Sequence, residues 1–581
     1  MIKTLSRCVR QYRTHSILSA VFVSLEVLME CIIPLYMARI IDLGIEKADL
    51  PYVVRTGLLL IGMACLSLTF GVLSGRSAAI ASAGFARNLR HDLFYRAQDF
   101  SFSNIDHFST ASLVTRMTTD VTNLQNAYMM IIRVAVRSPV MLIFSVAMAF
   151  SIHRQLAGYF LLTVPVLGIG LYFIMSRAYP IFNRVFALYD RLNSVVQENL
   201  RGIRVVKSFV REDHEREKFN SVSEDIYDSF SRAERLLSFN SPLMMLCMQT
   251  CVLCVAWFGA KIIVYSGGTA LTTGLLTSLI TYAVQMLICL MMLSMVFVMI
   301  TISRASAKRI CEVLNEKIDL ADAEDPVTDV PDGSIRFDNV SFSYAGSMDK
   351  CCLFHIDLDI RAGETVGILG GTGDSKSTLV QLIPRLYDVT EGSVSVGGVD
   401  VRRYDLHALR HAVSMVLQKN ELFSGTIRDN LRWGNEDATD EELREVCRLA
   451  QADGFISAFP DGYDTWIEQG GTNVSGGQKQ RLCIARALLK KPKVLIFDDS
   501  TSAVDTRTDA LIRQGLQQYL PGATKLVIAQ RVSSVQHADK IVILHNGRIQ
   551  AVGTHESLLR DNEIYRELCY SQQKGGAGHE N

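Results

Sequence analysis

A glycine-rich turn follows the apolar run ETVGILG at residues 364–370 and precedes LVQLI, where a helical pattern begins. Exposed backbone N–H groups at a helix N-terminus bind phosphate, a lysine reaches the β- and γ-phosphates, and a hydroxyl binds Mg²⁺. Lys376 and Ser377 are predicted to supply the last two groups. The predicted nucleotide site comprises Gly370, Gly371, Thr372, Gly373, Asp374, Ser375, Lys376, Ser377 and Thr378.

Two later segments extend this chemistry. KVLIFDDST at residues 493–501 is typical of a buried strand, and it ends in Asp498, whose carboxylate suits Mg²⁺ directly or through water. Asp499 follows at once. Between the glycine-rich turn and this strand, NVSGGQKQR at residues 473–481 places a serine and two glycines where a helix begins, which predicts a second anion-binding surface.

In their order along the chain, these segments resemble the motifs of the ABC transporters. An apolar first half followed by such a cassette resembles the multidrug-type exporters, and the resemblance covers nearly the whole chain. It implies ATP and Mg²⁺ as cofactors, adenine stacking on Tyr344, and contact of Gln418 with Mg²⁺ and with the membrane domain. It further implies an X-loop in IEQGG (467–471), a D-loop residue, and a signature motif that binds a partner's ATP: Asp505 for the D-loop, and Val474, Ser475, Gly476, Gly477 and Gln478 for the signature.

Three residues of this chain's own nucleotide site depart from the family pattern. Ser375 stands where glycine is usual, so its Cβ crowds a close approach to phosphate, and Asp374 adds negative charge beside it. Asp499 stands where the family has the glutamate that polarises water, and the shorter side chain misplaces the carboxylate by an amount that costs on the order of 100-fold in rate. Gln530 replaces the switch-loop histidine and cannot become cationic.

The signature motif, in contrast, matches the family pattern except at its first residue, where Val474 replaces the usual leucine. In this family two cassettes pair head to tail, and each ATP lies between one chain's phosphate-binding Walker A loop, which the resemblance places at Gly370–Thr378 here, and the other's signature. We therefore expect a heterodimer with a second, non-identical half-transporter, in which this chain binds ATP with altered affinity but hydrolyses it poorly. The alternatives are a homodimer that hydrolyses ATP slowly at both sites and, from another class, an ATP-gated channel or regulatory subunit.

The first three hundred residues contain six apolar runs, each long enough for the roughly 20 residues that a bilayer-spanning helix needs. They lie at 17–41, 54–82, 127–152, 155–177, 241–266 and 272–303. The basic N-terminus resembles a signal peptide, but without a clear cleavage site a retained first helix is expected. The predicted fold is therefore an all-α six-helix membrane domain followed by an α/β P-loop cassette, and the family resemblance implies the type I (type IV) ABC exporter class.

Lysine and arginine concentrate in the N-terminal arm and in residues 87–116 and 184–217. The positive-inside rule then places both termini in the cytoplasm of a multi-pass protein of the cell membrane. The long connections have a helical pattern, so we expect them to continue the membrane helices into the cytoplasm. Their tips near 103–112 and 199–208 are predicted to be coupling helices that touch a cassette.

Some residues in the apolar runs bear on the transported substrate. Glu26 and Glu30 share a helix face. They predict either a cation-binding cavity or an ion pair with Arg39 or with a basic residue of another helix. Methionines gather in the last run and suit either a small amphiphilic substrate, such as a drug or lipid, or ordinary packing: Met286, Met291, Met292, Met295 and Met299, beside Phe297.

Composition limits the remaining function classes. The formal net charge is zero, so nothing indicates a nucleic-acid partner. The 13 cysteines lack metal-ligand spacing, and the Cys251–Cys254 pair lies in an apolar run, where we expect buried thiols. The predicted domains are a membrane domain over 1–320, a linker over 321–334 and a cassette over 335–575.

Overall fold

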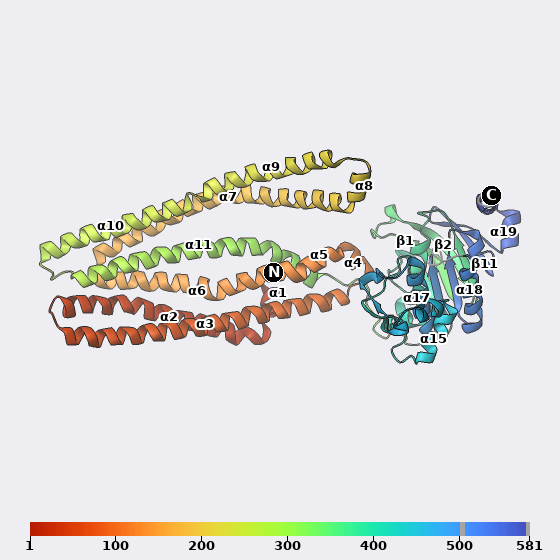
Figure 1. Cartoon of the computed structure of the whole chain (residues 1–581), viewed down its shortest axis with the longest axis horizontal. Coiled ribbons are helices and arrows are strands. Elements are labelled where there is room, and N and C mark those ends of the chain that lie inside the picture. The colour runs from red at the N-terminus through yellow and green to blue at the C-terminus, as the bar shows by residue number, and fades with distance from the viewer. Residues whose placement is uncertain (500–505, 577–581) are drawn as a thin grey trace. The chain divides into compact units, whose positions relative to one another are not determined.

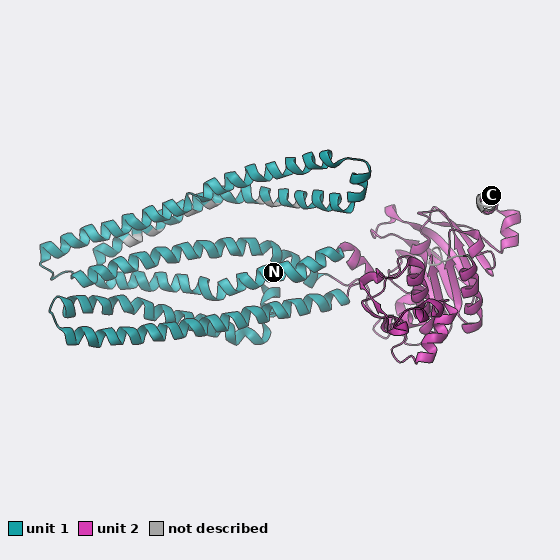
Figure 2. Cartoon of the chain, viewed as in Figure 1, with its two compact units in different colours: residues 1–98, 109–316 teal, residues 99–108, 317–581 magenta. Residues whose placement is uncertain are grey.

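The computed structural model describes residues 1–499 and 506–576. The chain divides into two compact units, one of residues 1–98 and 109–316 and the other of residues 99–108 and 317–581 (Figure 2). Part of the predicted linker packs on the second unit. Val330 is buried there, and the amide of Val327 donates to the carbonyl of Arg403 at 2.9 Å.

The first unit is helical, and six of its helical segments are long and apolar enough to cross a membrane, as predicted. Each segment has apolar side chains around most of its circumference. An α-helix also satisfies its backbone N–H and C=O groups internally, as the interior of a bilayer requires. The long helices are α2 (Arg13–Arg39), α3 (Leu50–Gln98), α6 (Val121–Ile152), α7 (Arg154–Arg201), the successive helices α9 (Glu212–Leu237) and α10 (Asn240–Ser266), and α11 (Thr273–Asn315).

Short helices occur at the predicted tips and at the N-terminus. They are α1 (Ile2–Arg7), α4 (Phe102–His107), α5 (Thr110–Thr115) and α8 (Ile203–Ser208). The helix α4 falls in the second compact unit. Two π-helical turns, η2 (Ile40–Ile45) and η3 (Arg116–Asp120), continue α2 and precede α6.

The long helices pack as neighbours in a defined order. The helix α2 packs on α3 and α6, α6 packs on α11, and α7 runs beside α9 and α10 (Figure 1). Small residues permit the closest approaches: a Cβ at Gly274 of α11 would lie 2.3 Å from the carbonyl oxygen of Ala38 in α2. Near that contact, Ser278 of α11 donates to the carbonyl of Pro34 at 2.6 Å.

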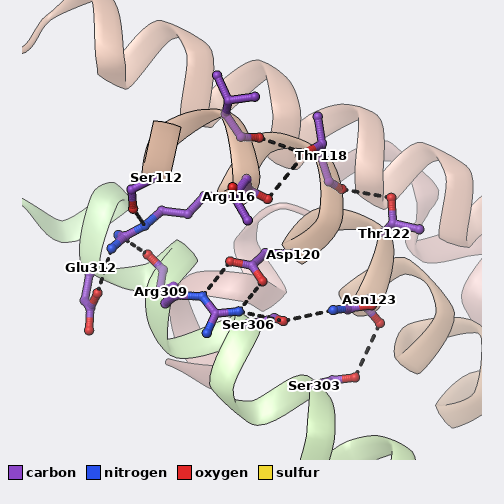
Figure 3. A network of polar contacts seen from close by, with 12 residues as sticks. Ser112, Arg116, Thr118, Asp120, Thr122, Asn123, Ser303, Ser306, Arg309 and Glu312 are labelled. Atoms are coloured by element: carbon purple, nitrogen blue, oxygen red, sulfur yellow. Dashed lines mark hydrogen bonds and ion pairs between the residues drawn. The ribbon is translucent and has the colours of Figure 1, made fainter. Parts of the chain in front are cut away.

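A polar network joins the π-turn η3 to the C-terminal part of α11 (Figure 3). The fully buried carboxylate of Asp120 accepts from both Nε and an NH2 group of Arg309, the former at 2.8 Å. Arg116 donates to the carbonyl of Arg309 at 2.7 Å and pairs with Glu312 at 3.3 Å. This network ties the helix that follows α4 to the helix that leads into the cassette.

A second charged cluster lies among α2, α3 and α6. Arg137 of α6 donates to Glu26 and also to both oxygens of Glu30 at 2.8 Å. Of the two predicted alternatives, the ion pair with a basic residue of another helix is therefore confirmed. The guanidinium of Arg39, the other candidate, lies 5.0 Å from the ring centre of Tyr36. Arg137 thus pairs with the carboxylates of both acids in a region of apolar helices, where an unpaired charge is costly.

The sulfur-containing side chains divide between packing and exposed positions. Met286 is fully buried between helices, which favours packing for this residue, whereas Met291, Met292 and Met295 are exposed on the single chain. The thiol of Cys251 is buried, as expected, and Cys254 is half-buried. All thirteen cysteines fall within the described residues and are free.

The second unit contains two main sheets. The antiparallel sheet has the order β2-β1-β4-β5, and the six-stranded sheet has the order β12-β11-β3-β10-β9-β6, in which only β12 is antiparallel to its neighbour within the described residues. Their bounds are β1 Ile335–Phe342, β2 Leu353–Ile360, β3 Thr365–Leu369, β4 Glu391–Val396, β5 Val399–Asp400, β6 Val413–Val416, β9 Val494–Asp498, β10 Thr524–Ile528, β11 Lys540–His545 and β12 Arg548–Gly553. A short pair, β7 (Gly425–Thr426) and β8 (Trp466–Ile467), lies apart.

Helices complete the predicted α/β cassette. They are α12 Lys376–Gln381, α13 Leu406–Ala412, α14 Ile427–Arg432, α15 Asp440–Leu449, α16 Asp453–Ser457, α17 Gly476–Leu489, α18 Thr506–Tyr519, α19 His555–Asp561 and α20 Glu563–Gly576. Strands β3, β9 and β10 are buried on both faces and consist mostly of apolar residues, as parallel strands require. Their carboxyl ends meet at one edge of the sheet, where ligands bind in such folds.

Candidate nucleotide site

The glycine-rich turn connects β3 to α12, as the sequence predicts. Its first glycine is required, because a Cβ at Gly370 would lie 2.4 Å from the carbonyl oxygen of Leu544. The ammonium of Lys376 lies over the turn and donates to the carbonyls of Gly370 at 3.0 Å and Gly371 at 2.6 Å. Burial lowers the pKa of Lys376, because partial desolvation disfavours the charged ammonium.

Ser375 occupies a left-handed backbone conformation, with φ of 63° and ψ of 28°. Glycine adopts this conformation freely, whereas a residue with a Cβ pays about 1 kcal/mol or more for it. The departure from the family pattern at Ser375 therefore falls where the backbone itself demands glycine. The loop keeps the shape but carries strain together with an extra side chain.

The carboxylate of Asp374 points into the loop structure rather than to solvent. It is buried and accepts hydrogen bonds from the backbone N–H groups of Gly371 and of Asn546, the latter at 2.9 Å. His545 lies 3.6 Å from it. Asp374 therefore uses one of the loop amides that a phosphate would otherwise share, a role that the motif alone did not reveal.

The two predicted Mg²⁺ ligands lie together. The hydroxyl of Ser377, at the start of α12, donates to Asp498 at the end of β9 with a distance of 2.7 Å. Burial, and then the neighbouring charge of Asp499, raise the pKa of Asp498 above its usual range. A hydroxyl and a carboxylate are hard oxygen ligands, so these residues fit Mg²⁺, which would supply positive charge beside the β- and γ-phosphates.

The two departures Asp499 and Gln530 meet at the carboxyl ends of neighbouring strands. Asp499 directly follows β9 and Gln530 follows β10 by two residues. The side-chain amide of Gln530 donates to a carboxylate oxygen of Asp499 at 2.9 Å. Asp499 also has φ of 47°, outside the range that side chains prefer. The carboxylate that would orient a water is thus held in an amide hydrogen bond.

The predicted signature motif forms the start of α17. Ser475 is its N-cap: the hydroxyl accepts from the amide of Gln478 at 3.3 Å, and the Gln478 side chain accepts from the amide of Ser475 at 2.9 Å. This reciprocal capping box satisfies the backbone amides of Ser475 and Gln478. The Gly476 position is open, with nothing within 4 Å of an added Cβ, and Val474 packs against the core below.

The remaining predicted site residues are placed as follows. The hydroxyl of Tyr344 lies 3.0 Å from Thr378 and donates to Gln381 at 3.3 Å, while the residue is 54% exposed and so presents its ring to solvent. Gln418 is exposed just after β6. Asp505 lies outside the described residues. In the X-loop segment, Glu468 accepts from Thr472 at 2.8 Å.

Comparison with known families identifies both halves of the chain. The family described as "ABC transporter transmembrane region" matches residues 16–291, and the family described as "ABC transporter" matches residues 353–502. The chain is 37% identical over 555 residues to an uncharacterized ABC transporter ATP-binding protein, YfiB, of Bacillus subtilis, with 96% of each chain covered. It is 32% identical over 488 residues to an ATP-dependent lipid A-core flippase of Desulfotalea psychrophila, with 84% of each covered.

A solved structure is similar over nearly the full length. It is described as a bacterial Atm1-family ABC exporter with ATP bound, with a TM-score of 0.83, 25% identity, and coverage of 97% of this chain and 98% of that one. Together with six apolar helical segments, these similarities indicate a multi-pass membrane protein with an ATP-binding domain. The chain belongs to the ABC transporter family, as a half-transporter with the exporter fold.

Proposed function

We propose that this chain is one subunit of an asymmetric exporter that moves small amphiphilic molecules out of the cytoplasm. The observation that carries the proposal is the hydrogen bond between Gln530 and Asp499. A general base must have its carboxylate available to water in the reacting geometry. Here a shortened carboxylate is engaged by a neutral amide, so this chain's own Walker site holds ATP and hydrolyses it slowly.

The other half of the proposal concerns the signature motif. A capped helix start with an open position at Gly476 offers backbone N–H groups and a helix dipole to an anion. Ser475 and Gln478 form that capped start. We infer that they complete the ATP site of a non-identical partner, whose Walker loop supplies the glutamate and the histidine. The relevant assembly is then a heterodimer in the cell membrane with both termini cytoplasmic.

Within this chain, each group has a defined task toward nucleotide. The backbone amides of the Gly370–Thr378 loop and Lys376 bind phosphates, and the exposed ring of Tyr344 stacks on the base. Ser377, Asp498 and Gln418 would hold Mg²⁺. Binding of ATP between two cassettes draws them together, and the coupling helices pass this movement to the membrane helices.

The substrate class rests on the membrane half. Its exposed apolar surface, including the methionines of α11, suits an amphiphile whose apolar part is accommodated without fixed polar contacts. One similar protein is named as a lipid A-core flippase, which supports a lipid-like substrate. Transport into inverted membrane vesicles, measured with fluorescent lipids and cationic dyes, tests this class.

The heterodimer is tested by purifying the chain alone and together with a candidate partner half-transporter. We expect the chain alone to hydrolyse ATP slowly, and the complex to hydrolyse it rapidly through the partner's glutamate. Changing that glutamate to glutamine would abolish turnover, whereas Asp499→Asn would leave most of it. Brisk hydrolysis by the chain alone, lost on Asp499→Asn, would contradict the proposal and support a homodimer.

A further inference from the structure

Tyr387 contacts two functional elements of the second compact unit. Its ring centre lies 5.1 Å from that of Tyr344, at an interplanar angle of 90°. Its hydroxyl donates to the carboxylate of Asp106, in α4, at 2.7 Å. Tyr387 therefore lies between the residue proposed to stack on the base and the helix predicted to couple the cassette to the membrane domain.

On one side, α4 is held to the cassette by several groups. Phe102 lies edge-on to the Tyr387 ring at 6.0 Å, Asn104 donates to the carbonyl of Lys317 at 3.0 Å, and Ser103 donates to Asp319. The contacts through Asn104 and Ser103 end on the chain segment that follows α11. The contact through Tyr387 leads instead toward the nucleotide site.

On the other side, the position of Tyr344 is fixed at its hydroxyl but not over its ring. The hydroxyl is bonded to Thr378 and Gln381 of α12, immediately after the phosphate-binding turn. The ring of Tyr344 is perpendicular to the ring of Tyr387 and nearly perpendicular to that of Phe342, whose centre lies 4.9 Å away. Tyr344 is 54% exposed, and a base stacked on its exposed part would fix the ring and with it the perpendicular contact to Tyr387, because perpendicular aromatic pairs depend on geometry.

We propose that Tyr387 is a positioning residue that transmits base occupancy at Tyr344 to α4 of the same chain. The proposal takes the base to lie on Tyr344, as proposed above, and it holds whether or not the Walker site is degenerate. Burial, and then the Asp106 carboxylate, keep the pKa of Tyr387 well above its usual range, so the phenol remains the donor to Asp106. Coupling of this kind is reciprocal: the state of α4 must also change the affinity for the base.

The test measures hydrogen–deuterium exchange of α4 amides in the full-length transporter with and without ATP. In the wild type, ATP slows exchange of residues 102–107. Tyr387→Phe keeps the ring against Tyr344 but removes the bond to Asp106, so ATP should still bind while its effect on α4 falls by about fivefold. Asp106→Asn, which leaves the cassette intact, should give the same loss, and the double variant should lose no more than either alone.

A matched control is Tyr404→Phe, which removes a tyrosine hydroxyl that donates to the carbonyl of Val396 at 2.8 Å inside the same unit. It should leave the response of α4 to ATP unchanged. Tyr344→Ala should abolish the response and weaken nucleotide binding, and if it does neither, the base does not lie on Tyr344 and the earlier assignment fails. A full α4 response in both Tyr387→Phe and Asp106→Asn, or additive losses in the double variant, would overturn the role of Tyr387.

Discussion

The side-chain amide of Gln530 donates a 2.9 Å hydrogen bond to the carboxylate of Asp499, although the two residues lie 31 positions apart in the chain. By the resemblance to the family, they are assigned to the positions of its water-orienting glutamate and its switch histidine. The two residues thus form one local arrangement, in which a neutral amide donates a hydrogen bond to a short carboxylate.

Restoring the family residues should restore hydrolysis at this site. We expect Asp499→Glu with Gln530→His to raise the hydrolysis rate of the chain's own site by about 10- to 100-fold, because the longer carboxylate again reaches water. The measurement uses the heterodimer in which the partner's glutamate is changed to glutamine. The double variant Asp499→Asn with Gln530→His is the control and should stay inactive. Equal hydrolysis rates for the two double variants would contradict the role of the carboxylate at position 499.

Removing the Cβ at position 375 should favour nucleotide binding. Ser375→Gly relieves a left-handed backbone, which stabilises the fold by no more than about 1 kcal/mol after the entropy of the unfolded glycine is counted. It also opens the loop to phosphate, so binding of ATP measured by titration calorimetry should tighten. Asn339→Gly, at another position with positive φ, should leave ATP affinity unchanged.

The charged cluster of Glu26, Glu30 and Arg137 should tolerate replacement of all three residues better than removal of one. Arg137→Gln leaves Glu26 and Glu30 without their shared cation, and we expect a loss of about 3–5 kcal/mol in stability. Replacing all three residues with methionine should recover most of that loss. Thermal unfolding of the purified transporter measures both effects.

Arg133, one turn from Arg137 on α6, provides the control for the cluster. It makes no ion pair within 4 Å in the described part of the chain, and its guanidinium lies 3.6 Å from the position of a Cβ at Gly75. Arg133→Gln should cost much less than Arg137→Gln. Similar losses for the two variants would show that Arg137 contributes as an ordinary polar residue and not as the shared cation.

The network at the π-turn should depend on its buried member. Asp120→Ala leaves the guanidinium of Arg309 without its carboxylate, and we expect a loss of about 2 kcal/mol in stability together with less transport per ATP hydrolysed. Glu312→Gln changes a carboxylate whose side chain is 42% exposed and should cost under about 1 kcal/mol. Equal effects would show that the contact of Glu312 with Arg116 matters as much as the buried carboxylate of Asp120.

Much of the fold and site follows from contiguous sequence. The phosphate loop, the strand that ends in Asp498 and the helix that begins at Gly476 are each encoded within about ten residues, and apolar run length alone located the membrane helices. Local patterns cannot specify contacts between distant segments. Arg137 lies 107 residues from Glu30, and nothing in the sequence favoured it over Arg39 as the partner.

The orientation of the Asp374 side chain toward the loop could not be predicted from a local sequence pattern either. A carboxylate beside a phosphate loop suggests repulsion, but the side chain of Asp374 folds onto the amides of Gly371 and Asn546. Asn546 is brought there by the adjacent strand β11, which pairs with β3. The sheet order, rather than the motif, decides which groups surround this aspartate.

The sharing of Arg137 by two acids of α2 also bears on how the chain enters the membrane during synthesis. The acids emerge from the ribosome 111 and 107 residues before their counter-charge. Until α6 arrives, α2 is a poor candidate for release into lipid, since its carboxylates have no guanidinium beside them. We therefore expect integration of the first helix to be completed only when the third follows, so nascent chains truncated before residue 137 should be extracted and degraded.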